Sequence, residues 1–356
     1  MEAEERAGAV LSLDALIADL AAPPRAEVLL EGFVPPPRFA EKRFENYLPD
    51  PRHPSQEEAL AQLQGLAEEL RRGADGGLLG RLRSALGQGA RGRGIYLDGG
   101  FGVGKTHLLA ALWHAAPAPK SYLSFDELVY SIGLLGVNGA REAFRGQRLI
   151  AVDEWELDDP GNLKLALAWL RGALGEGSAV AVTSNTIPDE LGRGRFSQKD
   201  FQAEIEELAG AFQVLRVAGE DFRHRHFQAD AGREYLLDRQ TLEQRARAAG
   251  ESALLVAFAE LLAGLGRMHP IRYAGLIEEI DSLWVAGLAR IENLPDALRW
   301  VHFIDKLYDD AVPLAASGEI ALAELFPESF LSGPFAKKFG RCLSRMEELL
   351  GDSSTP

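Results

Sequence analysis

The segment from Gly99 to Thr106 constrains the fold of this chain more than any other part of it. It reads Gly-Gly-Phe-Gly-Val-Gly-Lys-Thr and fits the spacing G-x-x-x-x-G-K-[ST], in which a glycine-rich turn joins a strand to a helix. The apolar run at residues 94–97 predicts a buried strand before the turn, and residues 106–113 predict a helix after it. The context therefore indicates a nucleotide-binding α/β protein, and a chance glycine-rich turn is the less favoured interpretation.

The residue types in this turn suit a triphosphate. Glycine permits a backbone with positive φ, so consecutive N–H groups can point at an anion from the start of a helix. Lys105 is expected to reach the β- and γ-phosphates, and the Thr106 hydroxyl to bind Mg²⁺. The predicted nucleotide-binding residues are Gly99, Gly100, Phe101, Gly102, Val103, Gly104, Lys105, Thr106 and His107.

A second apolar run, at residues 149–152, ends in the acidic pair Asp153 and Glu154. Ligands of open parallel sheets bind at the carboxyl ends of the strands, so both carboxylates are expected beside the phosphates. We predict that Asp153 holds Mg²⁺ through water and that Glu154 polarises the water that attacks the γ-phosphate. In isolation the pair would also suit an ordinary strand that ends in an acidic loop, and the phosphate-binding turn favours the catalytic interpretation.

A third buried run, at residues 179–183, leads to Asn185. If its strand lies between the other two, Asn185 can orient the attacking water or contact the γ-phosphate; otherwise it is a turn-forming asparagine. Further along, Arg193 and Arg195 lie in a glycine-rich segment. Arg195 is the candidate for an arginine finger toward a neighbouring subunit, and a solvated basic loop explains the pair equally well.

Several further segments occur in the same order in one family of ATPases. They are Phe44-x-x-Tyr47-x-Pro49-Asp50, Pro54-Ser55-Gln56, Thr183-Ser184-Asn185, Gly219-Glu220-Asp221-Phe222-Arg223, Phe303-Ile304-Asp305-Lys306-Leu307-Tyr308-Asp309 and Arg341-Cys342-Leu343-Ser344-Arg345-Met346. With the two nucleotide motifs they resemble the ZapE family of AAA-type ATPases, which are bacterial cell-division ATPases with mitochondrial relatives in inner-membrane protein quality control. The likeness runs from about residue 44 to residue 350.

This resemblance implies ATP and Mg²⁺ as cofactors, and hydrolysis that remodels or regulates a protein partner, as in the division machinery. It also implies a homo-oligomer when ATP is bound. Relatives often carry Gln-Arg where this chain has Gln198-Lys199, which leaves the finger assignment open between Arg193 and Arg195. The alternative is an initiator-like or helicase-loader-like ATPase that acts with nucleic acid, because residues 102–108 also look like the phosphate-binding turns of those proteins.

Charge and composition favour the protein-directed interpretation. The formal net charge of −15 opposes sequence-independent binding to nucleic acid, which needs a basic surface, although arginines between residues 71 and 93 leave a local basic face open. Cys342 is the only cysteine, so no intrachain disulfide is possible. The acidic first residues do not resemble a signal peptide, and we expect a cytoplasmic protein whose membrane contact is peripheral and made through a partner.

Breakers and periodicity predict the organisation of the chain. We expect strands at 94–98, 120–124, 148–152, 178–184 and 213–217, and helices at 56–72 and 78–86. The segment from Ser124 to Glu127 fits a capping box, which predicts that the helix after the second strand starts there. The expected fold class is an α/β P-loop NTPase of the ASCE or AAA-like kind, with a parallel sheet flanked by helices and a C-terminal α/β extension instead of a typical helical lid. The strands at 282–288 and 312–317 are expected to extend the central sheet, and 253–262 to form a core helix. The expected divisions are an N-terminal approach segment (1–55), the ATPase core (56–218), a hairpin and helix insertion (219–250), the C-terminal extension (251–350) and a tail (351–356).

Overall fold

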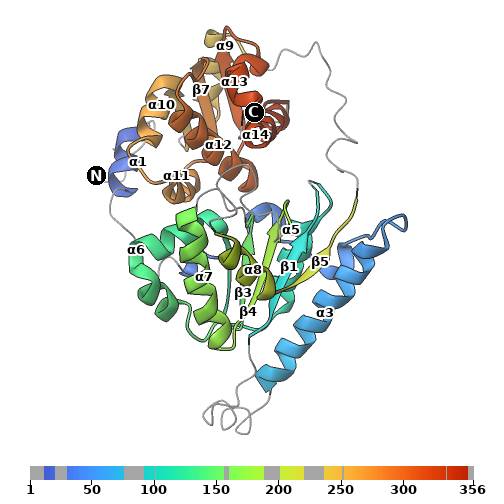
Figure 1. Cartoon of the computed structure of the whole chain (residues 1–356). Coiled ribbons are helices and arrows are strands. Elements are labelled where there is room, and N and C mark those ends of the chain that lie inside the picture. Colours follow the sequence, from blue (N-terminus) through green and yellow to red (C-terminus); the bar gives the residue numbers. More distant parts are fainter. Residues whose placement is uncertain are drawn as a thin grey trace, which may run out of the picture. The chain divides into compact units, whose positions relative to one another are not determined.

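The structure is a computed structural model, and it divides the chain into two compact units (Figure 1). One unit comprises Pro24–Ala229, and the other comprises Met1–Pro23 together with Asp230–Pro356. The structure describes residues 12–20, 30–75, 92–100, 102–155, 160–187, 201–219, 236–250, 252–333 and 335–351.

The unit of residues 24–229 is built on a five-stranded parallel sheet with the strand order β2-β3-β4-β1-β5. The strands are β1 (Gly94–Asp98), β2 (Lys120–Ser124), β3 (Leu149–Asp153), β4 (Ala179–Ser184) and β5 (Phe212–Arg216). All five were predicted from the sequence, and β4 lies between β3 and β1 as the interpretation of Asn185 requires. Their continuous apolar runs reflect burial on both faces of the sheet.

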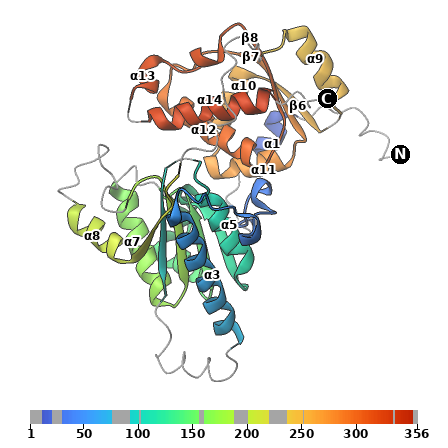
Figure 2. The same ribbon diagram turned by 90° about the vertical axis from the view of Figure 1, so that its right-hand side faces the viewer.

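Helices cover both faces of this sheet, as Figure 2 shows. They are α3 (Pro54–Asp75), α5 (Lys105–Ala115), α6 (Phe125–Ala143), α7 (Pro160–Gly175) and α8 (Gln202–Gly210). The apolar core of one face joins side chains of α3 and α5 to the sheet, and the core of the other face joins α6, α7 and α8. The sheet thus separates two apolar layers, and the turn that starts α5 lies on the α3/α5 side.

Local signals place the helix starts as expected. The Ser124 amide donates to Glu127 Oε2 at 2.7 Å and the Glu127 amide donates to Ser124 Oγ at 3.2 Å, so the predicted capping box begins α6. Two short 3-10 helices, η1 (Pro37–Phe39) and η2 (Phe44–Asn46), precede α3. A helix predicted at 78–86 lies outside the described residues.

The expectation that the C-terminal strands extend the central sheet is wrong. Strands β6 (Ala253–Ala257), β7 (Ser282–Leu288) and β8 (Leu314–Gly318) form a separate three-stranded parallel sheet in the order β6-β7-β8. Residues 253–262 are also not one helix, because β6 ends at Ala257 and α10 (Phe258–Leu265) follows it. A short apolar run suits a buried strand and a buried helix equally, and periodicity alone does not separate them.

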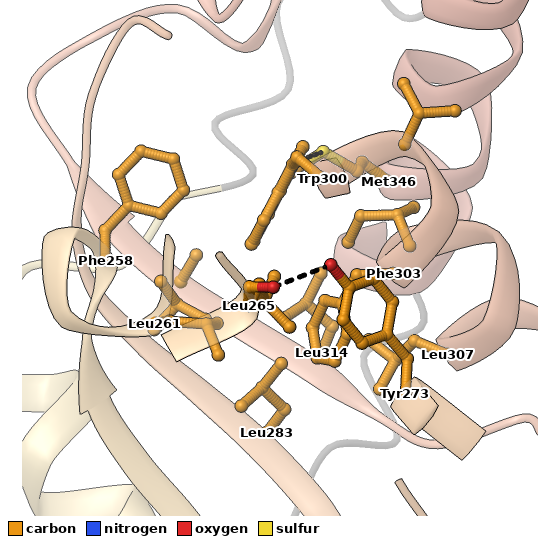
Figure 3. Packing of buried hydrophobic residues seen from close by; sticks show 14 of the residues in the cluster. Phe258, Leu261, Leu265, Tyr273, Leu283, Trp300, Phe303, Leu307, Leu314 and Met346 are labelled. Carbon is orange, nitrogen blue, oxygen red and sulfur yellow. Dashed lines mark hydrogen bonds between the residues drawn. The ribbon is translucent and has the colours of Figure 1, made fainter. Parts of the chain in front are cut away.

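This second sheet has its own helices and its own apolar core. Besides α10, the helices are α1 (Leu13–Leu20), α9 (Arg239–Ala248), α11 (Tyr273–Glu278), α12 (Leu294–Asp309), α13 (Glu328–Leu331) and α14 (Ala336–Gly351), with the 3-10 helices η6 (Pro270–Arg272) and η7 (Leu322–Glu324). Figure 3 shows part of the core, where Tyr273 donates to the Leu265 carbonyl at 3.0 Å and Trp300 Nε1 donates to Met346 Sδ at 3.4 Å.

None of the helices in the described residues has both the length and the apolar character that crossing a membrane requires.

The first helix of the chain completes this C-terminal core. Helix α1 packs against α10 and α11, and its Leu13 and Ile17 are buried there (Figure 1). Gly264 of α10 makes room for it, since a Cβ at that position would lie 2.7 Å from Ile17 Cδ1. An ion pair of 2.5 Å joins Asp14 to Arg267. The expected N-terminal segment 1–55 is therefore divided between the two units.

A buried ion-pair network joins α12 to α14. Asp305 pairs with Arg341 at 2.5 Å and with Arg345 at 2.7 Å, and Arg345 lies 3.6 Å from Asp309. Burial would raise the pKa of Asp305, but the charges of Arg341 and Arg345 outweigh it and hold the pKa below its ordinary value. The two C-terminal segments that resemble the ZapE family thus form the two sides of one charge network.

Candidate active site

The predicted phosphate-binding turn lies between the end of β1 and the start of α5. Gly102 and Gly104 adopt positive φ values of 67° and 93° there, which glycine accepts without strain. The first amides of α5, from Lys105 onward, have no acceptor within the helix and are suited to an anion. Phe101 lies outside the described residues.

Lys105 and Asn185 are in direct contact. The Lys105 ammonium donates to the carbonyls of Gly99 at 2.7 Å and Gly100 at 2.5 Å, and to Asn185 Oδ1 at 2.9 Å. Lys105 is the first residue of α5, which follows β1 through the turn, and Asn185 comes directly after β4, the strand that pairs with β1. The sequence predicts that Lys105 reaches the β- and γ-phosphates and that Asn185 orients the attacking water or contacts the γ-phosphate, and the fold brings the two side chains together.

Asp153 is a partly buried carboxylate at the centre of a hydrogen-bond network. Thr106 Oγ1 donates to its Oδ1 at 3.3 Å, the Thr183 hydroxyl also donates to Oδ1, and the Tyr122 hydroxyl donates to Oδ2 at 3.0 Å. Burial and then the charge of Glu154 raise the pKa of Asp153, while hydrogen bonds from Thr183 and Tyr122 act in the opposite direction. The hydrogen bonds of Thr183 and Tyr122 to Asp153 were not predicted from the sequence.

The same residues have the chemistry of a magnesium site. Mg²⁺ prefers oxygen ligands and is usually held by one or two carboxylates together with substrate phosphates rather than by a cage of protein side chains. The Thr106 hydroxyl and the Asp153 carboxylate are neighbouring oxygen donors of that kind. The described residues contain no cluster of three or more His, Cys, Asp or Glu side chains suited to a metal.

Glu154 follows Asp153 in an unusual backbone conformation. Its φ is 53°, in the left-handed region of backbone conformation that residues other than glycine rarely adopt. Its amide donates to Thr183 Oγ1 at 3.0 Å, and the next amide, of Trp155, donates to the Thr183 carbonyl at 2.7 Å. The buried Trp155 ring lies 4.8 Å from that of Phe125. Strain of this kind persists where surrounding contacts enforce it, and such positions cluster at active sites.

The segment at residues 43–47 lies against the turn and the first turn of α5. The Tyr47 hydroxyl donates to the Val103 carbonyl at 3.4 Å, and its ring meets that of His107 edge-on. His107 Nε2 lies 3.0 Å from the Arg43 carbonyl and 2.8 Å from Asn46 Oδ1, and burial lowers the pKa of the imidazole. The His107 side chain thus contacts the segment of residues 43–47, and its predicted contact with the nucleotide stays a prediction.

The segment that leads to Gln56 lies close to the end of β5. Gln56 Nε2 donates to the Ala218 carbonyl at 2.8 Å, and the Asp50 amide donates to Gln56 Oε1 at 2.8 Å. A Cβ on Gly219 would lie 2.9 Å from Gln56 Nε2 and 3.1 Å from Val103 Cγ1. Two segments that carry the family resemblance therefore meet beside the turn. Residues 220–223, Arg193 and Arg195 lie outside the described residues.

Gly104→Ala is expected to destabilise the unit of residues 24–229 by about 1–3 kcal/mol and to weaken nucleotide binding. Its φ of 93° strains any other residue, and the new Cβ would lie 2.7 Å from Tyr47 Cε2. Thermal unfolding and calorimetric titration with ATP measure the two effects. Gly100→Ala is the matched control for stability, because nothing lies within 4 Å of a Cβ there. Equal unfolding temperatures for the two variants would contradict this account.

Comparison with known proteins identifies similar chains. The family model of the AFG1-like ATPases matches residues 34–248 and 231–353. The cell division protein ZapE of Escherichia coli (strain K12) is 24% identical over 300 residues, which cover 72% of this chain and 78% of that protein. The ZapE protein of Escherichia coli O157:H7 matches with the same values.

Similar solved structures are found among proteins of DNA replication. The DnaC helicase loader matches with a TM-score of 0.36 and 14% identity, over 51% of this chain and 99% of that one. AMPPCP-bound DnaA from Aquifex aeolicus matches with a TM-score of 0.38 and 13% identity, over 89% of both chains. TM-scores this low do not support a transfer of function.

Proposed function

Because this chain belongs to the AFG1-like ATPase family and is an ATPase, we propose that it couples Mg²⁺-dependent hydrolysis of ATP to the remodelling of a protein partner associated with cell division. The observation that carries the catalytic part is the convergence of residues at the carboxyl ends of β1, β4 and β3, three adjacent strands. Lys105 contacts Asn185 there, and Thr106 contacts Asp153.

Each of these side chains has a proposed role toward the triphosphate. The turn amides and Lys105 bind the β- and γ-phosphates, and Thr106 and Asp153 hold Mg²⁺. Bound Mg²⁺ would neutralise negative charge on the phosphate oxygens. Glu154 accepts the proton of the attacking water, and Asn185 orients that water or contacts the γ-phosphate.

We also propose that ATP-bound copies assemble, with Arg195 reaching the site of a neighbouring copy and Arg193 as the alternative. An arginine finger supplied by another subunit contributes about 10³–10⁵ in kcat. Arg195→Ala should then bind ATP normally and lose the stimulation of hydrolysis that accompanies assembly.

We place this activity in the cytoplasm, with any membrane contact made through the partner.

The proposed partner is a protein rather than a nucleic acid. The relative named above is a cell division protein, and the net charge of −15 disfavours a surface that tracks phosphates. An initiator-like ATPase that acts on nucleic acid is the competing function. A DNA-binding titration separates the two, because nucleic-acid binding would weaken steeply between low and physiological salt.

A substrate trap tests the protein-directed function. Glu154→Gln is expected to hold ATP without turnover and to retain the partner in an ATP-dependent way. Lys105→Ala is the control, because it removes the charge that binds the phosphates and should capture nothing beyond background. Equal capture by both variants, or capture of nucleic acid alone, would contradict the proposal.

A further inference from the structure

Tyr122 reaches the magnesium site from a neighbouring strand. It lies on β2 and pairs in register with Ala151 of β3, so Asp153 is two residues further along β3 and shares its face of the sheet. Diagonal neighbours of this kind are about 7–8 Å apart at the backbone, which only long side chains span. The Tyr122 side chain spans this distance, and its hydroxyl donates to Asp153 Oδ2 at 3.0 Å.

Packing fixes where this hydroxyl lies. The Tyr122 side chain is 4% exposed and belongs to the apolar core on the α3/α5 side of the sheet. A buried ring has little rotational freedom, so its hydroxyl is held at one position relative to the end of β3. The neighbouring carboxylate therefore meets a donor whose place is set before any ligand binds.

The donors around Asp153 are divided between its two oxygens. Oδ1 accepts hydrogen bonds from Thr106, Thr183 and the Glu154 amide, whereas Oδ2 accepts the hydrogen bond of Tyr122. Rotation of the carboxylate group would break contacts at both oxygens. The Tyr122 hydrogen bond thus opposes the rotation that would move Oδ1 away from Thr106.

We infer that Tyr122 is a positioning residue for Mg²⁺: its hydroxyl holds the Asp153 carboxylate in the orientation that keeps Oδ1 beside the Thr106 hydroxyl. This inference rests on the proposed function, since it assigns Mg²⁺ to Thr106 and Asp153. Outer partners orient metal-binding side chains in this way, and their loss typically costs 10–100-fold in metal affinity or activity. Tyr273, by comparison, donates to a backbone carbonyl inside the core of the other unit.

The test measures how strongly Mg²⁺ promotes nucleotide binding, without turnover. AMPPCP is titrated by calorimetry into the full chain, once in EDTA and then over a series of Mg²⁺ concentrations. Tyr122→Phe removes the hydroxyl and keeps the ring, and Tyr122→Leu is a second variant that removes both. Tyr273→Phe is the matched control, because it deletes an equally buried hydroxyl far along the chain from the site.

Tyr122→Phe is expected to raise by about tenfold the Mg²⁺ concentration at which half of the Mg²⁺-dependent gain in AMPPCP affinity is reached. The affinity for AMPPCP measured in EDTA should stay unchanged. The Tyr273→Phe control should match the parent in both values. A half-saturation point within twofold of the parent in the Tyr122 variants would overturn the inference and leave the ATPase function intact. A parent protein whose AMPPCP binding ignores Mg²⁺ would instead overturn the proposed metal site itself, and the inference with it.

Discussion

Glu154→Gln is expected to lower the steady-state kcat for ATP hydrolysis by about 10²–10⁴-fold while ATP still binds. An amide cannot accept the proton of the attacking water, so the substitution removes a general base and little else. The left-handed backbone at this position is held by the Glu154 amide and the neighbouring Trp155, which the substitution retains. Phosphate release measures kcat, and calorimetry measures the affinity for ATP.

Two further variants complete this test. Glu127→Gln changes another carboxylate, one in the first turn of α6 that accepts a hydrogen bond from the Ser124 amide, and should leave kcat within about twofold. Lys105→Ala should lose ATP binding itself, because the ammonium is the charge placed against the terminal phosphates. Parental turnover by Glu154→Gln would show that another group activates the water.

Asp305→Asn is expected to destabilise the C-terminal unit by about 3–5 kcal/mol. Two nearly buried arginines face this carboxylate, and neutralising it leaves both charges short of their partner away from water. Because its pKa is held below the ordinary 3.8, the contribution is present above that pH and is lost as the pH falls through the lowered value. The loss in the variant should therefore shrink in acid.

Denaturant unfolding of the full chain checks this expectation, with the two units followed as separate transitions rather than as one. Glu243→Gln is the control, because its ion pairs with Arg239 and Arg247 lie on the exposed surface of α9 in the same unit. Exposed pairs of this kind contribute about 0–1 kcal/mol. A loss for Asp305→Asn no larger than that of the control would show that the network is not needed for stability.

The contacts within the candidate nucleotide site were predictable because their main signals are local. A glycine-rich turn with Lys105 and an acidic pair after a buried run can each be recognised from a few consecutive residues. The position of Asn185 depended on one further condition, namely that β4 lies between β3 and β1, which the structure shows and the sequence left open. The family resemblance added the C-terminal segments but not their purpose.

Contacts that depend on strand register or tertiary packing were not predictable. Tyr122 reaches Asp153 only because β2 and β3 pair in one register, which neither strand encodes alone. The pairing of Asp305 with Arg341 joins residues of two helices, and the sequence shows only two charged helical segments. Strands β7 and β8 were predicted, yet no local sequence signal indicated that they pair with β6 rather than with the central sheet.

The position of α1 sets an order on biosynthesis. Its binding surface on α10 and α11 is encoded about 240 residues later, after the whole nucleotide-binding unit. A ribosome therefore releases α1 long before the helices that receive it, and the ATPase unit can fold while the other is incomplete. Helix α1 can pack only after α10 and α11 emerge, and the same apolar core also includes side chains of α14, so removal of either α1 or α14 should destabilise the same unit.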